Sequence, residues 1–124
     1  MDILIVEDNE AMRRLIRDLI CAPPNRCHEC PDGSQAQGAY ARHRPEWVLI
    51  DSEMKTADGI AVAGQIYAAF PEAKILIITG HEDADLRQAA QAAGACRYVL
   101  KENLLDVRRW LQPSLGQPSQ QPVQ

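Results

Sequence analysis

The feature that most constrains the fold is an alternation of short apolar runs with segments of helical periodicity, repeated five times along the chain. The apolar runs are residues 3–6, 26–30, 47–50, 74–78 and 98–100. Most of them are rich in β-branched residues and too short for helices, so they suit strands buried on both faces. The run at 26–30 is more polar and is expected at an edge of the sheet.

Each run is followed by a segment in which apolar residues recur three or four positions apart, as on one face of a helix. In chain order these residues are Met12, Leu15, Ile16, Leu19 and Ile20; Ala36, Ala39 and Tyr40; Ala63, Ile66, Tyr67 and Phe70; Leu86, Ala89, Ala90 and Ala93; and Leu104, Val107 and Leu111. Prolines or a glycine end four of the five segments, namely Pro23-Pro24, Pro45, Pro71 and Gly94.

Strands joined by helical crossovers require a parallel sheet with helices on both faces. The predicted fold class is therefore α/β and doubly wound. A chain of 124 residues suffices for one domain with a single core, which we place at residues 1–112. Residues 113–124 lack an apolar period, so they are expected to be a disordered tail or the start of a linker.

Charge and hydropathy argue against two function classes. The formal net charge is −4 and the basic residues are scattered among acids, so no direct binding of nucleic acid is expected. No apolar run approaches the ~20 residues that span a bilayer, and no charged-then-apolar leader opens the chain. The expectation is a cytoplasmic domain that does not contact a membrane.

The four cysteines, Cys21, Cys27, Cys30 and Cys96, are expected as free thiols, the default without a secretory signal. Cys27 and Cys30 have the spacing of zinc and redox motifs. In a strand, however, residues three apart point to opposite faces and cannot chelate one ion. With Cys21 and His28 the segment has four potential ligands in no standard spacing. Core or surface thiols are therefore favoured over a metal or redox role.

Polar residues follow four of the five predicted strands. Glu7 and Asp8 follow the first strand, Asp51 the third, Thr79 the fourth and Lys101 the fifth. Ligands of such sheets bind at the carboxyl ends of the strands. Three carboxylates, a hydroxyl and an ammonium should therefore converge on one small patch.

Carboxylates gathered at this edge would repel one another. Two such charges ~4 Å apart repel by about 4 kcal/mol at an effective dielectric near 20. A divalent cation removes the conflict, and oxygen ligands with room for water and phosphate suit Mg²⁺. Asp51 could then stay ionised as a nucleophile toward phosphorus. Lys101 could serve as a point charge on the phosphoryl oxygens, and Thr79 could donate a hydrogen bond to them.

These motifs, in this order, resemble the receiver domain of two-component response regulators from residue 2 to about residue 112. The residues that carry the resemblance are the paired acids of VEDNE, the acid that closes VLID, the loop DSEMKTADG, the threonine of IITG and the lysine of YVLKE. The resemblance implies a flavodoxin-like sheet of five parallel strands in the order 2-1-3-4-5. It also implies a phosphoacceptor without separate substrate turnover.

The resemblance assigns a role to each acid. Asp51 would accept a phosphoryl group from a sensor histidine kinase or a small phosphodonor. Asp8 and Asp51 would bind Mg²⁺ through their side chains and Glu53 through its backbone carbonyl, while Glu7 would act through water or help to hold the metal.

The resemblance also implies a switch. Thr79 would move toward the new phosphoryl group, and Tyr98 would swing inward behind it. The surface of the fourth helix, fifth strand and fifth helix would change and control a downstream protein or a fused output domain, such as a DNA-binding domain. A homodimer formed on phosphorylation is a further state that the family allows.

The chain departs from the family pattern at several positions. Glu53, two residues after Asp51, and His81, two residues after Thr79, flank the path of the hydrolytic water in this family. We expect both side chains to tune the lifetime of the phosphorylated state. Glu102 replaces a proline that often follows the lysine, which leaves open whether the preceding peptide bond is cis.

Each assignment has a plainer alternative. Asp8, with Asn9, would simply cap the first helix, and Thr79 would be a helix-entry hydroxyl. Lys101 would be a solvated edge charge and Tyr98 a half-buried strand aromatic. Asp51 is harder to explain in this way, because a carboxylate at the end of a buried strand is costly without partners.

Two rival functions remain. A phosphorylation-independent adaptor would keep the fold and bind a partner through the same face, although an adaptor need not retain the acid, threonine and lysine set. The second is a phosphatase with an aspartyl nucleophile. An aspartate two residues after Asp51 would support it, but this chain has Glu53 there.

Overall fold

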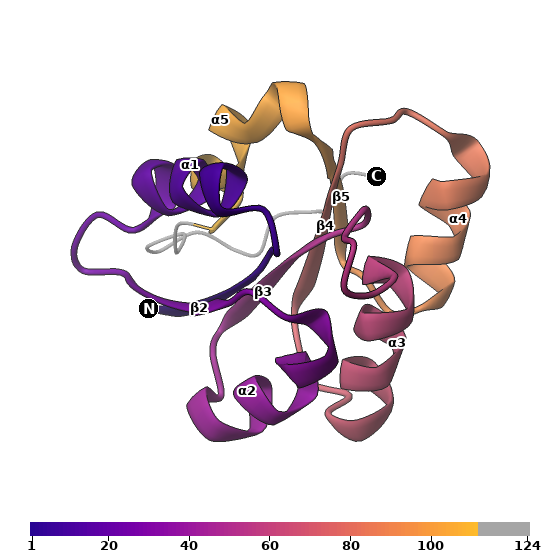
Figure 1. The fold of residues 1–124 in the computed structure, drawn as a ribbon, viewed down its shortest axis with the longest axis horizontal. Coiled ribbons are helices and arrows are strands. Elements are labelled where there is room, and N and C mark those ends of the chain that lie inside the picture. The colour runs from indigo at the N-terminus through magenta and orange to yellow at the C-terminus, as the bar shows by residue number, and fades with distance from the viewer. Residues whose placement is uncertain (112–124) are drawn as a thin grey trace, which may run out of the picture.

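The computed structural model describes residues 1–111, so the predicted tail at 113–124 lies outside the described residues. Five parallel strands form one sheet in the order β2-β1-β3-β4-β5, which confirms the predicted topology (Figure 1). The strands are β1 (Asp2–Val6), β2 (Arg26–Cys30), β3 (Trp47–Asp51), β4 (Ile75–Thr79) and β5 (Arg97–Leu100). The polar strand β2 is an edge strand, as predicted.

Helices cover both faces of the sheet (Figure 1). They are α1 (Glu10–Ile20), α2 (Ala36–His43), α3 (Gly59–Ala69), α4 (Ala84–Ala92) and α5 (Leu104–Leu111), with short 3-10 turns η1 (Gly33–Gln35) and η2 (Lys101–Asn103) before α2 and α5. Helices α1 and α5 lie on one face, and α2, α3 and α4 on the other. The sheet is therefore the middle of three layers.

Alternate residues of the strands enter two separate cores, as the twofold period of a strand requires. Toward α1 and α5 the core contains Ile3, Ile5, Leu49, Leu76, Ile78, Ile16, Ile20, Leu104, Val107 and Leu111. Toward the other three helices it contains Leu4, Val6, Val48, Ile50, Ile75, Ile77, Tyr40, Val62, Ile66 and Ala90. Both faces of the sheet are buried, which explains why the central strands read as continuous apolar runs.

Side-chain caps fix where three helices begin. The Asn9 side chain accepts a hydrogen bond from the backbone N–H of Met12, and Asp58 and Asp83 cap α3 and α4 in the same way. Such caps satisfy N–H groups that have no partner within the helix. Because the helices begin at the carboxyl end of the sheet, their caps fix the loops that carry the polar residues.

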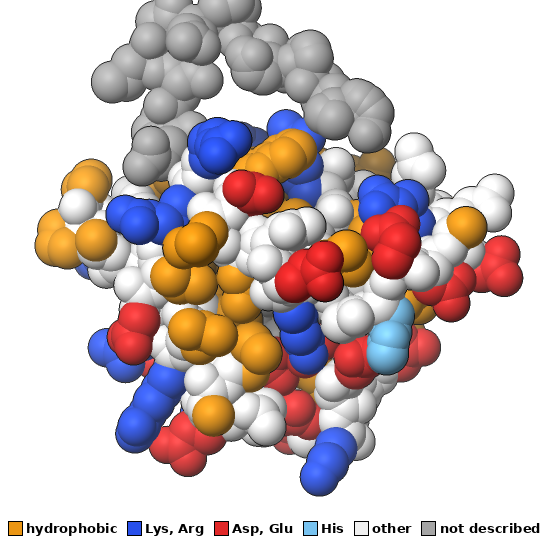
Figure 2. Space-filling model, turned by 90° about the horizontal axis from the view of Figure 1, so that it is seen from above, with side chains coloured by type: hydrophobic (Ala, Val, Ile, Leu, Met, Phe, Trp, Pro, Cys, Tyr) orange, Lys and Arg blue, Asp and Glu red, His pale blue; other side chains and the backbone are white. Residues whose placement is uncertain are grey.

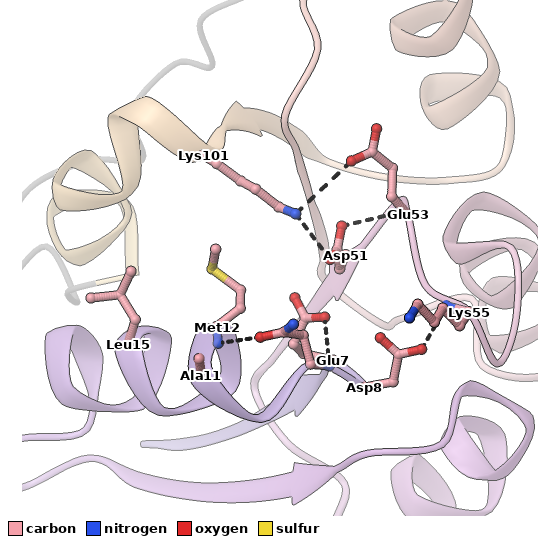
Figure 3. Close-up of a pocket in the computed structure, with 10 residues that line it drawn as sticks. Glu7, Asp8, Ala11, Met12, Leu15, Asp51, Glu53, Lys55 and Lys101 are labelled. Carbon is pink, nitrogen blue, oxygen red and sulfur yellow. Dashed lines mark hydrogen bonds and ion pairs between the residues drawn. The ribbon is translucent and has the colours of Figure 1, made fainter.

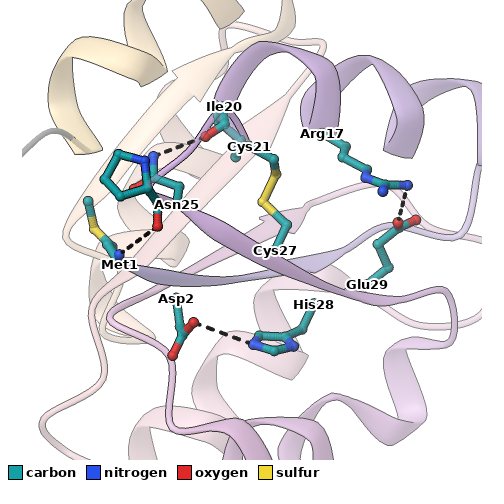
Figure 4. Close-up of a disulfide and its surroundings, with 10 residues drawn as sticks. Met1, Asp2, Arg17, Ile20, Cys21, Asn25, Cys27, His28 and Glu29 are labelled. Carbon is teal, nitrogen blue, oxygen red and sulfur yellow. Dashed lines mark hydrogen bonds and ion pairs between the residues drawn. A yellow bond between two sulfur atoms is a disulfide. The ribbon is translucent and has the colours of Figure 1, made fainter.

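The expectation of four free thiols was wrong, because Cys21 and Cys27 form a disulfide (Figure 4). Cys21 is the C-cap of α1, and Cys27 is the second residue of β2. The turn between them brings their Cα atoms to 5.8 Å, within the range that a disulfide spans. Cys30 is buried and free, and Cys96 is exposed and free. Cys27 and Cys30 lie on opposite faces of β2, as predicted.

Three apolar residues assigned to buried helix faces are instead exposed, namely Ala89 and the larger Leu15 and Tyr67. The exposed fraction is 45% for Leu15 on α1 and 42% for Tyr67 on α3. On each helix only part of the apolar face packs against the sheet, and Leu15 and Tyr67 lie at the border of that face. The Tyr67 ring packs against Gly94, which has φ +104° and where a side chain would collide with the ring.

No helix within residues 1–111 combines the length and the apolar character that crossing a membrane demands. On the face drawn in Figure 2, acidic and basic side chains are interspersed, and apolar side chains gather beside them.

Candidate functional site

A pocket of about 360 Å³ opens at the carboxyl end of the sheet. Its walls come from the β1–α1 loop, the first turns of α1, the β3–α3 loop and the start of η2 (Figure 3). The residues that line it are Glu7, Asp8, Asn9, Ala11, Met12, Leu15, Asp51, Glu53, Lys55 and Lys101. The structure thus brings together the three predicted carboxylates and the predicted lysine, although they lie up to 94 positions apart in sequence (Glu7 to Lys101).

Asp51 ends β3 inside this pocket, and its side chain is only 2% exposed. Its Oδ2 lies 3.2 Å from Lys101 Nζ, and its Oδ1 accepts a hydrogen bond of 2.9 Å from the backbone N–H of Glu53. A buried carboxylate is tolerated only when it is paired and hydrogen-bonded. Lys101 and the following loop supply both, so Lys101 is not a solvated edge charge.

Glu7 is fully buried, which is unusual for a glutamate. Its Oε2 accepts a hydrogen bond of 3.2 Å from the backbone N–H of Asn9, whereas its Oε1 is buried without a hydrogen-bond partner. Burial, followed by the proximity of the Asp51 carboxyl, raises the pKa of Glu7 to about 8. Glu7 therefore keeps its proton near neutral pH.

Asp8 does not cap α1, since Asn9 has that role. Asp8 is turned toward the β3–α3 loop instead (Figure 3). Its Oδ2 accepts two hydrogen bonds, one of 2.6 Å from the backbone N–H of Lys55 and one of 3.0 Å from that of Thr56. Both bonds use the same oxygen, which leaves Oδ1 for another partner. Asp8 thus ties together the two loops that carry the site's carboxylates.

Glu53 lies at the mouth of the pocket between two basic groups. Its Oε2 is 2.7 Å from His81 Nε2, and its Oε1 is 3.9 Å from Lys101 Nζ. The Glu53 and His81 side chains are 41% and 71% exposed, so this pair is solvated. The structure therefore places the two predicted tuning residues in direct contact beside Lys101.

Thr79 and Tyr98 lie behind the pocket rather than in its lining. Thr79 is fully buried at the end of β4, and its hydroxyl accepts a hydrogen bond of 3.3 Å from the backbone N–H of His81. Thr79 is not a helix-entry residue, since α4 begins at Ala84. The Tyr98 hydroxyl donates a hydrogen bond of 2.9 Å to the His81 carbonyl oxygen, and the Arg87 guanidinium lies 4.5 Å from the Tyr98 ring centroid. Residues 79, 81 and 98 are thus linked through one short loop.

The donor chemistry of the pocket fits a hard divalent cation. All of its candidate ligands are oxygens; among them is the buried Glu7 Oε1, which has no hydrogen-bond partner, on a carboxyl group that neighbours Asp51. Within residues 1–111 no three His, Cys, Asp or Glu side chains are already gathered closely enough to hold a metal ion. Asp8 is turned toward the amides of Lys55 and Thr56. Ion binding would therefore require Asp8 to offer Oδ1 or to release these amides.

Sequence reasoning missed two residues that shape the site. Gly59 is the first residue of α3, and a side chain there would collide with the carbonyl oxygen of Asp51. The glycine was predicted only as part of a turn, and nothing in the sequence indicated the close approach. Arg13 was assigned to the outer face of the first helix, but its guanidinium donates a hydrogen bond of 3.0 Å to the Glu7 carbonyl oxygen.

Within residues 1–111 the only cis peptide bond joins Pro23 and Pro24, so the bond between Lys101 and Glu102 is trans.

Known proteins resemble this chain in sequence and in structure. A family model described as the response regulator receiver domain matches residues 3–108. Response regulator MprA from Mycobacterium sp. strain KMS is 30% identical over 104 residues, which cover 84% of this chain and 45% of that protein. The DNA-binding transcriptional regulator NtrC from Salmonella typhimurium is 28% identical over 97 residues, which cover 78% of this chain and 21% of that protein.

A solved structure gives the same result. A LuxR-family two-component response regulator from Aurantimonas sp. SI85-9A1 superposes with a TM-score of 0.81 at 28% identity. The superposition covers 87% of this chain and 79% of that one. The chain spans less than half of the length of the two relatives named above, MprA and NtrC.

Proposed function

The chain belongs to the response regulator receiver domain family, and from this premise we propose that it is a phosphorylation-driven switch with Asp51 as the phosphoacceptor. The observation that carries the proposal is the buried Asp51 carboxylate paired with Lys101 at the carboxyl edge of the sheet. A carboxylate in such a place is oriented, partly desolvated and accessible from one open pocket. These properties are useful in a nucleophile and costly in a purely structural residue.

In the proposed reaction, an Asp51 carboxylate oxygen attacks phosphorus in a phosphohistidine of a sensor histidine kinase or in a small acyl phosphate. The new bond joins phosphorus to the Asp51 oxygen as the bond from phosphorus to the donor breaks, and the bonding electrons leave with the donor. The backbone N–H of Glu53 holds Asp51 Oδ1, which leaves Oδ2 as the attacking atom. Attack would displace Lys101 from Oδ2 toward the incoming phosphoryl oxygens.

Lys101 and Thr79 are proposed to bind the transferred group. The Lys101 side chain is 26% exposed, so its ammonium can follow the charge from the carboxylate to the phosphoryl oxygens. Thr79 can turn its hydroxyl proton toward the same oxygens while its hydroxyl oxygen accepts a bond from the backbone N–H of His81. Movement of Thr79 would disturb the loop that holds the Tyr98 hydroxyl. Tyr98 is therefore the proposed second part of the switch.

We assign Mg²⁺ to the side chains of Asp8 and Asp51 and the backbone carbonyl of Glu53, with Glu7 acting through water. The bound cation would neutralise the clustered carboxylates and the phosphoryl oxygens. The chain's own contribution is to bury Glu7 next to Asp51. Burial holds a proton on Glu7 in the metal-free protein, and Glu7 would release this proton when a cation binds beside it.

Glu53 and His81 are proposed to tune the lifetime of the phosphorylated state. Their 2.7 Å contact lies next to Lys101, whose Nζ is 3.9 Å from Glu53 Oε1 and 3.2 Å from Asp51 Oδ2. A water that attacks the phosphoryl group from this side must pass them. Replacement of both residues should therefore change the dephosphorylation rate, and an unchanged rate would refute this part of the proposal.

The output is proposed to pass through the surface of α4, β5 and α5 to a downstream protein or fused domain, with no separate substrate turnover. Tyr98 lies on β5, and Arg87, which stacks on it, lies on α4. A change at the site can thus reach this surface through two contacts. NtrC is a DNA-binding regulator of which this chain matches 21%, so a DNA-binding output and dimer formation on phosphorylation are proposals for a longer protein.

Beryllofluoride, an analogue of the phosphoryl group, separates this function from that of an adaptor. ¹⁵N-labelled protein with Mg²⁺ and beryllofluoride should show shifted amide resonances around Asp51, Thr79 and Tyr98. Asp51→Asn serves as the matched control and should show no shifts. A wild-type spectrum that does not change would support a phosphorylation-independent adaptor.

A further inference from the structure

Beyond the residues assigned above, we propose that Arg13 is a positioning residue for the two acids of the β1–α1 loop. This inference rests on the proposed function, because Glu7 and Asp8 are the acids that function uses. Arg13 lies on α1, outside the pocket lining, and reaches the loop from behind.

The Arg13 guanidinium joins two elements. Its Nη1 donates a hydrogen bond of 3.0 Å to the carbonyl oxygen of Glu7, and its Nε donates one of 2.9 Å to Glu29 Oε1 on β2. The Arg13 side chain is only 15% exposed. A planar guanidinium can form both bonds at once in a fixed geometry, whereas a lysine ammonium presents a single point charge.

The carbonyl oxygen that Arg13 binds belongs to the peptide that joins Glu7 to Asp8. Because a peptide unit is planar, a hydrogen bond at this oxygen restrains the direction in which both side chains leave the main chain. The other side of Glu7 is fixed as well, since its N–H donates a hydrogen bond of 3.1 Å to the Cys30 carbonyl oxygen on β2. Strand β2 thus holds Glu7 directly at its N–H and, through Glu29 and Arg13, at its carbonyl.

Strand β2, which bonds Glu7 in this way, is itself linked to α1. The Cys21–Cys27 disulfide joins the end of α1 to β2 (Figure 4). Cys27 and Glu29 are two positions apart, so they lie on the same face of the strand. Arg17 adds a second bond from α1, with its Nη1 3.1 Å from Glu29 Oε2 (Figure 4). Glu29 is therefore held in place when Arg13 binds it.

Arg17 provides a matched control, because both arginines bind Glu29 but only Arg13 contacts Glu7. The Arg17 side chain is 56% exposed. Mg²⁺ titrations by calorimetry should show that Arg13→Met weakens binding about 10-fold, as loss of an outer hydrogen bond to a metal site does. Arg17→Met should change the affinity by less than about twofold, since exposed ion pairs contribute little.

Amide spectra of the metal-free proteins give a second readout. The Asp8 amide resonance should shift in Arg13→Met and stay in place in Arg17→Met. Arg13→Lys keeps the positive charge but lacks the planar guanidinium, so it should bind Mg²⁺ as weakly as Arg13→Met. It also replaces the methionine variant if that variant does not fold.

Wild-type affinity in Arg13→Met or Arg13→Lys, or an equal loss in Arg17→Met, would overturn the role of Arg13. Failure of the wild-type protein to bind Mg²⁺ would instead contradict the proposed function. In that event the Asp8 resonance still decides whether Arg13 positions the loop.

Discussion

Lys101 Nζ lies 3.2 Å from Asp51 Oδ2, although Asp51 ends β3 and Lys101 directly follows β5, a strand that β4 separates from β3 in the sheet. The pair connects β3 to η2 across the carboxyl edge. Asp51 is almost fully buried and Lys101 is partly exposed, so Lys101 is the principal charge that compensates the carboxylate. The stability of the edge and the reactivity of Asp51 therefore depend on the same contact.

Replacement of Lys101 by methionine should destabilise the protein and slow phosphoryl acceptance by Asp51. Loss of one partner leaves a buried charge without compensation, and partial exposure reduces the cost to about 2 kcal/mol in the free energy of unfolding. Urea unfolding followed by circular dichroism measures this change. Lys55→Met is the matched control, because Lys55 lines the same pocket but forms none of the ion pairs found within residues 1–111. Equal effects of the two substitutions would exclude a specific role for the pair.

Stability in the absence of metal should fall as the pH rises toward 8. The pKa of Glu7 is raised from its ordinary value of 4.5 to about 8 in the folded protein. The folded state thus keeps a proton that the unfolded state releases within this window. Glu7 contributes fully to the free energy of unfolding below pH 4.5. As the pH rises toward 8, this contribution falls by up to about 1.4 kcal/mol per pH unit.

Glu7→Gln should remove this part of the pH dependence, because glutamine does not titrate and has a similar shape. The two proteins are compared by urea unfolding in a chelating buffer, which gives their free energies of unfolding. Suitable values are about pH 5.5, 6.5 and 7.5, which lie within this window. Parallel curves for wild type and variant would show that Glu7 is ionised throughout.

Reduction of the Cys21–Cys27 disulfide should lower the free energy of unfolding by roughly 2 kcal/mol, because the disulfide closes a short loop in the unfolded chain. The measurement is thermal unfolding with and without a dithiol reductant. The Cys21→Ala/Cys27→Ala double variant should be insensitive to the reductant, and its stability should match that of the reduced wild type. A titration of accessible thiols in the unfolded protein should find Cys30 and Cys96 only; four reactive thiols without reductant would contradict the pairing.

Gly59→Ala should destabilise the protein and impair the site, because the new Cβ would meet the Asp51 carbonyl oxygen and lie 2.7 Å from Ser52 Cα. Neither is the end of a flexible side chain, so the main chain beside the phosphoacceptor must move. Gly38→Ala on α2 is the matched control, since apart from its chain neighbours and the backbone of its own helix no atom lies within 4 Å of the new Cβ. Alanine at this helical position should stabilise the protein by about 0.5–1 kcal/mol. Denaturation midpoints should therefore move in opposite directions.

The fold follows from sequence because its signals are local. The runs at β1, β3 and β4 are almost entirely apolar, and the helical segments that follow them end at proline or glycine. These patterns fix the parallel sheet and, with it, the edge at which residues 8, 51 and 101 must meet. Residues that end parallel strands lie close together whatever their separation in the chain, which is why this part of the site could be predicted.

The rest depends on backbone geometry that no residue pattern encodes. Asp8 accepts hydrogen bonds from the amides of Lys55 and Thr56, groups that every residue type except proline offers. The disulfide depends on a turn that brings two Cα atoms to 5.8 Å. The exposure of Leu15 depends on how α1 is rotated on the sheet. Each is a consequence of packing, so it becomes visible only once the elements have been placed.

The intact mass of the protein after incubation with acetyl phosphate and Mg²⁺ shows whether Asp51 accepts a phosphoryl group. The wild-type protein should gain one phosphoryl group, and this gain should be absent in Asp51→Asn, abolished by a chelator and reduced in Lys101→Met. A wild-type mass that does not change, or an equal gain in Asp51→Asn, would contradict the assignment of Asp51 as the phosphoacceptor.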